Sequence, residues 1–318
     1  MSNSKEKPNI ELPQSAKDFL EYLSAIKNKS KDTAKGYECD LKIFFNFITT
    51  YKKKKKINNN FIKGITLKDL HAFVIDLAEE IIDKNGNKKC KNSEATRARK
   101  VACIKSYFNY LQYKAKLINY NPAFELESPK IPDKEIIYLD VNDSKHLLES
   151  VNKNDRNYKR NICILTVFLN TGLRASELCN LRIDMIKGEQ MTIIGKGGRK
   201  RQIYLNEVCL KVIKDYLLDR DDTGTSEEDK KYLFLSERKQ RIKKPTVQQL
   251  VKKHLGEADF DDRFHTHTLR ASFCTNVYNK GVGIKTLQTL MGHSQMSTTQ
   301  RYIGTDEESL KNAVKDIY

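Results

Sequence analysis

The chain has 318 residues, a length that favours two domains, and its 39% hydrophobic and 9% aromatic residues exclude a chain that is disordered throughout. Its 58 Lys and Arg residues outnumber 41 Asp and Glu residues, which gives a formal net charge of +17 with His neutral. This excess indicates a polyanion or an anionic surface as partner, although the codon bias of an AT-rich genome also enriches Lys and Asn.

The first 120 residues have the apolar spacing of amphipathic helices, and we expect this region to be helical throughout. The predicted helices cover residues 16–26, 33–50, 66–81 and 93–111. In the second helix one stripe carries Tyr37, Leu41, Phe44, Phe45 and Ile48. Thr66 and Asp69 have the spacing of a capping box, and Ser93 is placed to cap the fourth helix. The Lys52–Lys56 run falls between helices, where we expect a solvated loop.

A proline-bearing linker follows this helical region. Pro122, Pro129 and Pro132 end the helical periodicity and favour an extended connection. We therefore expect a helical domain at 12–122, a linker at 123–135 and a second domain at 136–318. The first domain is the more basic of the two per residue.

The second domain is expected to be mainly helical with one small β element. Residues 191–194 and 202–205 are short β-prone runs, and between them lies the glycine-rich basic segment Gly195-Lys196-Gly197-Gly198-Arg199-Lys200. This pattern predicts a β-hairpin with a basic tip, and an α+β fold class that is mainly α. The glycines do not form a phosphate-binding loop, because no helix follows them.

The cysteines and the N-terminal residues indicate the cellular compartment in which the protein is expected. The seven cysteines are odd in number and contain no CxxC pair, so neither a disulfide framework nor a zinc site is expected. Residues 1–14 lack the apolar core of a signal peptide, and no apolar run reaches the roughly 18 residues of a membrane span. We therefore expect a soluble cytoplasmic protein without membrane association.

Several polar motifs follow one another in the second domain. Thr171-Gly172-Leu173-Arg174 is followed by Glu177, and the hairpin lysine Lys196 comes next. Further on are His267-Thr268-Leu269-Arg270 and Leu290-Met291-Gly292-His293, with Tyr302 nine residues after His293. Taken singly, each has an ordinary structural explanation: a helix start, a salt-bridged core pair or a packed tyrosine. Together and in this order, they resemble the motif set of the tyrosine recombinases, the lambda-integrase-type site-specific DNA recombinases.

The resemblance spans the chain and carries expectations about fold and activity. It implies a C-shaped clamp around DNA, built from a SAM-like core-binding domain and a catalytic domain that ends in an exchange helix at 306–318. It implies a 3′-phosphotyrosyl intermediate, a Holliday junction, and no metal, ATP or other cofactor. The implied catalytic residues are Arg174, Lys196, His267, Arg270, His293 and the nucleophile Tyr302, with Glu177 in support. Ala271-Ser272 and Met291 depart mildly from the commoner family pattern.

The residue types suit this chemistry. Negative charge develops on the non-bridging oxygens of a pentavalent phosphorus, and the guanidinium forks of Arg174 and Arg270 match those oxygens. A phenol with a pKa of about 10 needs a base, for which His267 is the best candidate. Lys196 would protonate the leaving 5′ oxygen. Lys200, on the same hairpin and flanked by Arg199 and Arg201, is the rival for that role.

The resemblance also implies the partners. These are double-stranded DNA with inverted half-sites and, on DNA, a homo-tetramer or a hetero-tetramer with a paralogue, which is monomeric or weakly associated off DNA. We expect the terminal helix to dock on a neighbouring protomer, although its apolar stripe would also fit its own domain. The biological role is chromosome dimer resolution or mobile-element integration and excision, in a bacterial, nucleoid-associated setting.

Two alternatives to a recombinase remain. A type IB topoisomerase uses the same residue types, and a catalytically inactive DNA-binding protein would lack the nucleophile.

The sequence says least about which residues contact DNA. Arg97, Arg99 and Lys100 lie on a helix that would fit a major groove, but basic side chains more often reach phosphates, and a solvated face is also compatible with the pattern.

Overall fold

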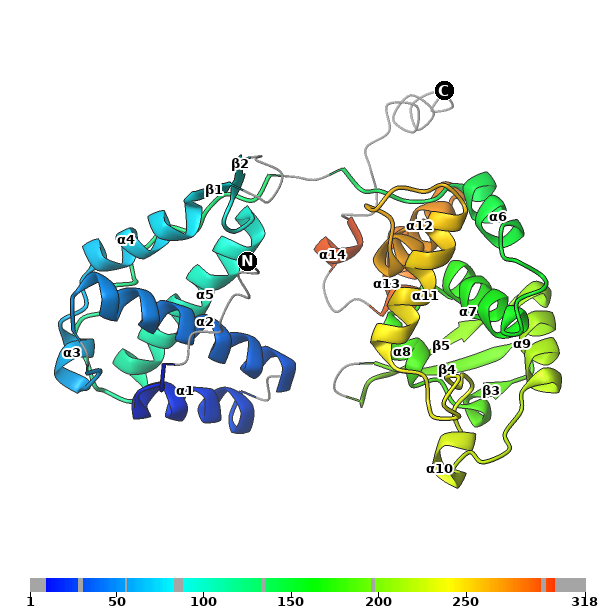
Figure 1. Ribbon diagram of the computed structural model, residues 1–318, viewed down its shortest axis with the longest axis horizontal. Helices are drawn as coiled ribbons and strands as arrows, with labels where there is room; N and C mark the ends of the chain where they lie inside the picture. The colour runs from blue at the N-terminus through cyan, green and yellow to red at the C-terminus, as the bar shows by residue number, and fades with distance from the viewer. Residues whose placement is uncertain are drawn as a thin grey trace, which may run out of the picture. The chain divides into compact units, whose positions relative to one another are not determined.

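The computed structural model describes residues 10–27, 31–54, 56–82, 88–132, 135–195, 198–292 and 296–300. The chain divides into two compact units, Met1–Lys134 and Glu135–Tyr318, which are described separately (Figure 1). Both are mostly helical, and a small antiparallel sheet lies in the second unit, so the predicted fold class is confirmed. Within the described ranges, no helix combines the length and the apolar character needed to cross a membrane.

The first unit contains the four helices that the sequence predicts, with ends that differ by a few residues. Its elements are α1 (Gln14–Ala25), α2 (Lys31–Tyr51), α3 (Asn59–Lys63), α4 (Leu67–Ala78), β1 (Glu80–Ile82), β2 (Lys88–Cys90) and α5 (Glu94–Tyr113). The core is rich in aromatic rings, because α2 and α5 each turn rings towards the other. Phe44 and Phe108 are fully buried, with ring centroids 6.3 Å apart. The predicted apolar stripe on α2 is therefore confirmed as a core-facing stripe.

Local capping signals fix where the helices begin. The Thr66 side chain accepts from the Asp69 backbone N–H and the Asp69 carboxylate accepts from the Thr66 N–H, which confirms the predicted capping box. The Ser93 hydroxyl accepts from the N–H of Thr96, as predicted for an N-cap. The expectation of an uninterrupted helical domain is wrong, because β1 and β2 pair antiparallel between α4 and α5. The β-branched pair Ile81-Ile82 and the later Asn85-Gly86 are the hairpin signal that the helical interpretation passed over.

The lysine run after α2 is only partly a solvated loop. Lys53, Lys54 and Lys56 are exposed, as expected. Lys52 instead donates to a carboxylate oxygen of Asp69 at 2.7 Å and to the carbonyl of Gly64 at 3.1 Å. The same carboxylate therefore caps α4 and holds the end of α2.

The second unit is built around α7. Its helices are α6 (Val141–Glu149), α7 (Tyr158–Thr171), α8 (Ala175–Cys179), α9 (Glu207–Asp219), α10 (Glu227–Lys230), α11 (Lys244–Glu257), α12 (Thr266–Asn279), α13 (Ile284–Met291) and α14 (Met296–Gln300). Residues 163–168 of α7 are all buried, and α9 and α12 pack against this helix. An α-helix that is buried on most of its faces is the centre of its domain.

The sheet of this unit is a three-stranded antiparallel meander. A 3₁₀ turn, η1 (Ile183–Met185), leads into β3 (Ile186–Lys187), which pairs with β4 (Gln190–Ile194), which pairs with β5 (Lys200–Tyr204). The hairpin predicted from the two β-prone runs is thus confirmed, whereas β3 was too short for its pattern to be recognised. Met191 and Ile203 face each other in the register and are buried.

The residues before and after Pro129 and Pro132 are each held by the unit on their own side. Ala123 and Leu126 lie in the core of the first unit, and the Lys105 ammonium donates to the carbonyl of Leu126 at 2.7 Å. At the other end, the N–H of Leu139 donates to the buried hydroxyl of Ser272 at 2.7 Å. Asn276 donates to the carbonyl of Leu139 at 3.1 Å. Ser272, one of the departures from the family pattern, therefore anchors the entry of the chain into the second unit.

Candidate active site

A glycine turn between α7 and α8 places the first site arginine. Gly172 ends α7 with φ +59°, and a Cβ at this position would lie 2.4 Å from the ring of Phe273. Only glycine meets both requirements without strain. Arg174 is then the N-cap of α8, and its N–H donates to Oε2 of Glu177 at 2.9 Å. The Thr-Gly-Leu-Arg motif is thus a helix end, a tight turn and a helix start.

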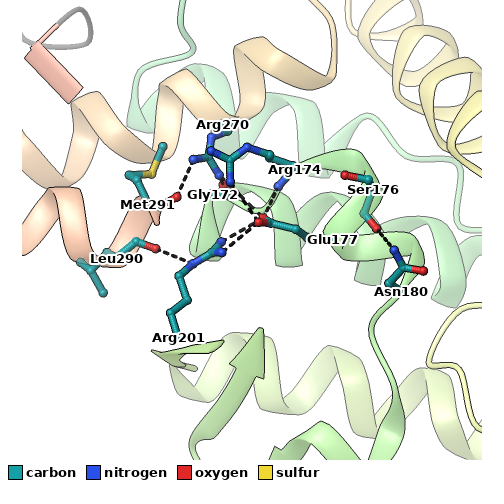
Figure 2. A network of polar contacts seen from close by, with 9 residues as sticks. All are labelled: Gly172, Arg174, Ser176, Glu177, Asn180, Arg201, Arg270, Leu290 and Met291. Carbon is teal, nitrogen blue, oxygen red and sulfur yellow. Dashed lines mark hydrogen bonds and ion pairs between the residues drawn. The ribbon is translucent and has the colours of Figure 1, made fainter. Parts of the chain in front are cut away.

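Glu177 lies at the centre of a cluster of three arginines (Figure 2). Its Oε1 accepts from Nη1 of Arg174 at 3.0 Å. Arg201 binds it with two parallel hydrogen bonds, from Nη1 to Oε1 at 2.8 Å and from Nη2 to Oε2 at 2.9 Å. Nη1 of Arg270 lies 3.9 Å from Oε2. The structure therefore brings together Arg174, Glu177 and Arg270, which the sequence separates by almost a hundred positions.

The described side chains of this cluster carry more positive than negative charge. The side chain of Glu177 is only 5% exposed, and burial, the largest single influence, would by itself raise the pKa of this carboxyl. The hydrogen bonds from Arg201 and from the Arg174 N–H, with the charges of both arginines, outweigh burial and lower its pKa to about 2. Glu177 is therefore ionised at neutral pH. Among the described residues, three guanidinium groups surround this one carboxylate, and such a concentration of positive charge attracts anions.

The two catalytic arginine candidates differ in exposure. The Arg174 side chain is 38% exposed, whereas that of Arg270 is 3% exposed. Arg270, on α12, donates to the carbonyl of Gly172 and, from Nη2 at 2.6 Å, to the carbonyl of Met291. Its guanidinium is thus fixed between the α7–α8 turn and the end of α13, while Arg174 extends towards solvent.

His267 lies one helical turn before Arg270 on α12, so the two share a face of that helix. The residue is exposed, yet its pKa is lowered, first by partial burial of the ring and then by the positive charges of His265, Lys244, Arg270 and Arg174. The rings of His265 and His267 have centroids 5.8 Å apart. A lowered pKa keeps the imidazole neutral near pH 7, which is the state that accepts a proton.

The remaining predicted catalytic residues lie outside the described ranges. These are Lys196, His293 and Tyr302, and the predicted exchange helix at 306–318 also lies outside them. The rival Lys200 is exposed and begins β5, opposite Ile194 in the register. Among the described residues, no group of three or more His, Cys, Asp or Glu side chains is placed to hold a metal ion.

The three basic residues suggested for DNA contact all lie on α5, and each has a partner within the first unit. Lys100 is 6% exposed and donates to the side-chain oxygen of Asn92 at 2.8 Å. Burial lowers the pKa of its ammonium. Its expected place on an open face of the helix is therefore wrong, because this ammonium belongs to the core of the unit.

The side chains of Arg97 and Arg99 are more exposed to solvent than Lys100 is. Arg97 is 18% exposed and pairs with Glu94 at 3.3 Å. Arg99 is 49% exposed, and both of its terminal nitrogens bind the carboxylate of Asp40, which is itself only 1% exposed. Burial raises the pKa of Asp40, and the charge of Arg99 opposes that rise. A buried carboxylate thus holds the Arg99 guanidinium at the surface of the unit.

The sequence motifs assign no role to Arg201, which flanks the rival Lys200. The signal that points to it is strand alternation, because Arg201 shares a face of β5 with Ile203, which is buried. An arginine on the inward face of a strand requires a buried partner. Glu177 is that partner.

Comparison with known proteins identifies the family. Residues 138–309 match the model described as the phage integrase family, and residues 16–114 match the phage integrase N-terminal SAM-like domain. The tyrosine recombinase XerC of Caldanaerobacter subterraneus subsp. tengcongensis is 42% identical, over 96% of this chain and 87% of that protein. A tyrosine recombinase of Pseudothermotoga lettingae is 32% identical, over 94% of this chain and 96% of the relative.

Among solved structures, the XerH site-specific recombinase bound to a palindromic difH substrate, in a post-cleavage complex, superposes with a TM-score of 0.70. It covers 95% of this chain and 84% of the other at 18% identity, and so supports the fold. These relatives do not favour the topoisomerase alternative, and the resemblance stated from the motifs is confirmed. The chain belongs to the phage integrase family and is a tyrosine recombinase, an enzyme of site-specific DNA recombination.

Proposed function

We propose that the cluster around Glu177 binds the scissile phosphate of a DNA strand and that Tyr302 attacks it. The observation that carries this proposal is the gathering of the Arg174, Arg201 and Arg270 guanidinium groups around one buried carboxylate, next to a histidine whose pKa is lowered. A guanidinium group can donate two parallel hydrogen bonds to a pair of anionic oxygens, and the phosphodiester of DNA carries such a pair in its two non-bridging oxygens.

The proposed reaction is a transesterification. The phenolic oxygen of Tyr302 forms a bond to phosphorus, the bond from phosphorus to the 5′ oxygen breaks, and a 3′-phosphotyrosyl ester remains. His267 takes the phenolic proton, and Lys196 supplies a proton to the departing 5′ oxygen. One phosphoester replaces another, so the energy of the bond is kept for resealing. Attack by the 5′ hydroxyl of a partner strand runs the same steps in reverse.

The arginines have different parts in this scheme. Arg270 is fixed by two backbone carbonyls and presents a preorganised positive charge, which costs no reorganisation as the transition state forms. Arg174 is the more exposed and contacts the incoming phosphate. His293 would donate a further hydrogen bond to a non-bridging oxygen. Removal of one such donor lowers the rate by about 10²–10³-fold in comparable sites.

We further propose that both units contact the same duplex, which carries inverted half-sites, and that four protomers assemble on paired sites. The proposed domains are the core-binding domain at 12–122, the linker at 123–135 and the catalytic domain at 136–318. The net charge of +17 supports tight, salt-sensitive binding to DNA. A DNA substrate also agrees with a cytoplasmic, nucleoid-associated location. The helix expected at 306–318 is proposed to dock on a neighbouring protomer.

A nicked suicide substrate tests the assignment of the proton donor. Footprinting of the protein on its own flanking genomic DNA first gives the site, and a nick beside the scissile phosphate then traps the covalent adduct. Lys196→Ala should fail to form the adduct, whereas Lys200→Ala and Lys187→Ala, which alters an exposed lysine on β3 of the same sheet, should form it. An inactive Lys200→Ala beside an active Lys196→Ala would reverse the assignment.

A further inference from the structure

We propose that Arg201 is a positioning residue of the recombination reaction, an inference that rests on the proposed function. In this view Arg201 does not touch the DNA. It joins three parts of the second unit that must keep one arrangement: Glu177 with its attached Arg174, the base of the β4–β5 hairpin, and the end of α13.

The guanidinium of Arg201 makes its hydrogen bonds within the protein. Its Nη1 and Nη2 bind the two carboxylate oxygens of Glu177, and its Nε donates to the carbonyl of Leu290 at 3.0 Å. Each of the three guanidinium nitrogens therefore donates one hydrogen bond within the protein, three of the five N–H groups in all, and the side chain is 10% exposed. This pattern fits a structural connector better than a phosphate ligand, which needs open donors.

Two glycines, Gly195 and Gly292, lie close to the guanidinium of Arg201. Gly292 has φ +62°, and a Cβ there would lie 2.9 Å from Nη1 of Arg201. A Cβ at Gly195 would lie 3.8 Å from the same nitrogen and 3.9 Å from Oε1 of Glu177. Gly195 immediately precedes Lys196, and Gly292 immediately precedes His293. The chain positions that lead into two proposed catalytic residues thus both border the Arg201 guanidinium (Figure 2 shows the Arg201 contacts).

Arg201 also affects how strongly Glu177 attracts Arg174. Arg201 satisfies both oxygens of Glu177, and this leaves Arg174 with one side-chain contact to the carboxylate. Without Arg201, Glu177 would draw Arg174 into a closer pair, and less positive charge would face a phosphate. Lysine is a poor substitute, because one ammonium lacks the planar fork that binds a carboxylate and a carbonyl together.

The test compares Arg201→Lys with a matched control, Arg220→Lys. Arg220 is also buried, at 5% exposure, and binds both oxygens of Asp222 and the carbonyls of Lys230, Tyr232 and Leu233. Single-turnover cleavage of the nicked substrate at saturating protein measures the chemical step, and titration of the same DNA measures its Kd. Both assays run well below the melting temperatures of the variants.

We expect Arg201→Lys to lower the cleavage rate by about 10–100-fold with Kd changed less than about 3-fold, and Arg220→Lys to change neither beyond about 3-fold. If Arg201 acts through Glu177, the double variant with Glu177→Gln should be no slower than the slower single variant. Equal rates for Arg201→Lys and wild type, a defect confined to Kd, an equal defect in Arg220→Lys, or additive losses would each overturn the proposal.

A second pair of variants keeps Arg201 in place, in case Arg201→Lys does not fold. Gly292→Ala pushes a methyl group against the guanidinium, whereas Gly281→Ala has the same kind of positive φ, +83°, and open space around it. Gly292→Ala should slow cleavage by about 10-fold or more relative to Gly281→Ala, and equal rates would count against the proposal. A wild-type protein that forms no adduct would instead contradict the proposed function itself.

Discussion

Replacement of Glu177 by Gln removes the carboxylate that three guanidinium groups share while keeping its size. The pKa of Glu177 is about 2 in the folded protein, against 4.5 for an ordinary glutamate. Because each unit of pKa difference corresponds to about 1.4 kcal/mol, the ionised carboxylate contributes about 3 kcal/mol to the free energy of unfolding at pH 7. Glu177→Gln should therefore destabilise the second unit by about this amount.

The sign of the pH dependence follows from the lowered pKa. The contribution is fully present above pH 4.5, the pKa in the unfolded chain, and is lost as the pH falls towards 2, where the folded protein also binds the proton. At pH 3.5 about 1.4 kcal/mol of the difference between wild type and variant should already be gone. Urea unfolding of the full chain at several pH values gives this difference, and hydrogen exchange in peptides across α8 reports on the second unit by itself.

Asp184→Asn is the control. Asp184 also receives two hydrogen bonds from one arginine, Arg182, but its side chain is 67% exposed. An exposed pair of this kind contributes about 0–1 kcal/mol, so the control should unfold almost like wild type. A Glu177→Gln variant as stable as the control, or a destabilisation that stays constant between pH 7 and pH 3.5, would refute the reasoning about the buried carboxylate.

Three further predictions follow from the same structure. The wild-type kcat/KM for cleavage should be flat above about pH 6.5 and fall in acid as His267 takes up a proton, and His267→Gln should be slower and lack this acid limb in a pH-rate profile. Gly172→Ala places a methyl group 2.4 Å from a phenylalanine ring and should lower the free energy of unfolding by about 2 kcal/mol more than Gly224→Ala, which has positive φ and open space. Arg99→Gln should reduce the slope of log Kd for DNA against log salt by about 1, whereas Lys100→Gln, at a buried ammonium, should leave the slope unchanged. An unaltered acid limb in His267→Gln, equal stabilities of the two alanine variants, or equal salt slopes would contradict the respective predictions.

Features set by neighbouring residues were predictable from the sequence. Thr66 and Asp69 form the expected capping box because both partners lie within one turn. The β4–β5 hairpin was recognisable from two β-prone runs around glycines, and the apolar stripe of α2 from its helical spacing. The order of the motifs in the second half was sufficient to identify the family, since each motif marks a residue type that phosphoryl transfer needs.

Features set by distant contacts were not predictable. A lysine on a helix is normally solvated. Only the folded structure shows that Lys100 is buried and that Asn92 accepts a hydrogen bond from its ammonium. Arg201 lies 24 positions from Glu177, and no local pattern connects them. The β1–β2 pair is a local exception: its three-residue strands carry little periodicity, and the sequence signal Asn85-Gly86 was outweighed by the long helical pattern before it.

The most direct test of the proposed mechanism is identification of the residue that becomes attached to DNA. The wild-type protein is incubated with the nicked substrate, digested with protease and nuclease, and the nucleotide-bearing peptide is sequenced by mass spectrometry. We predict a single adduct, joining the 3′ phosphate to Tyr302 through its phenolic oxygen, and no adduct in Tyr302→Phe. An adduct on another residue, or one that persists in Tyr302→Phe, would contradict the account.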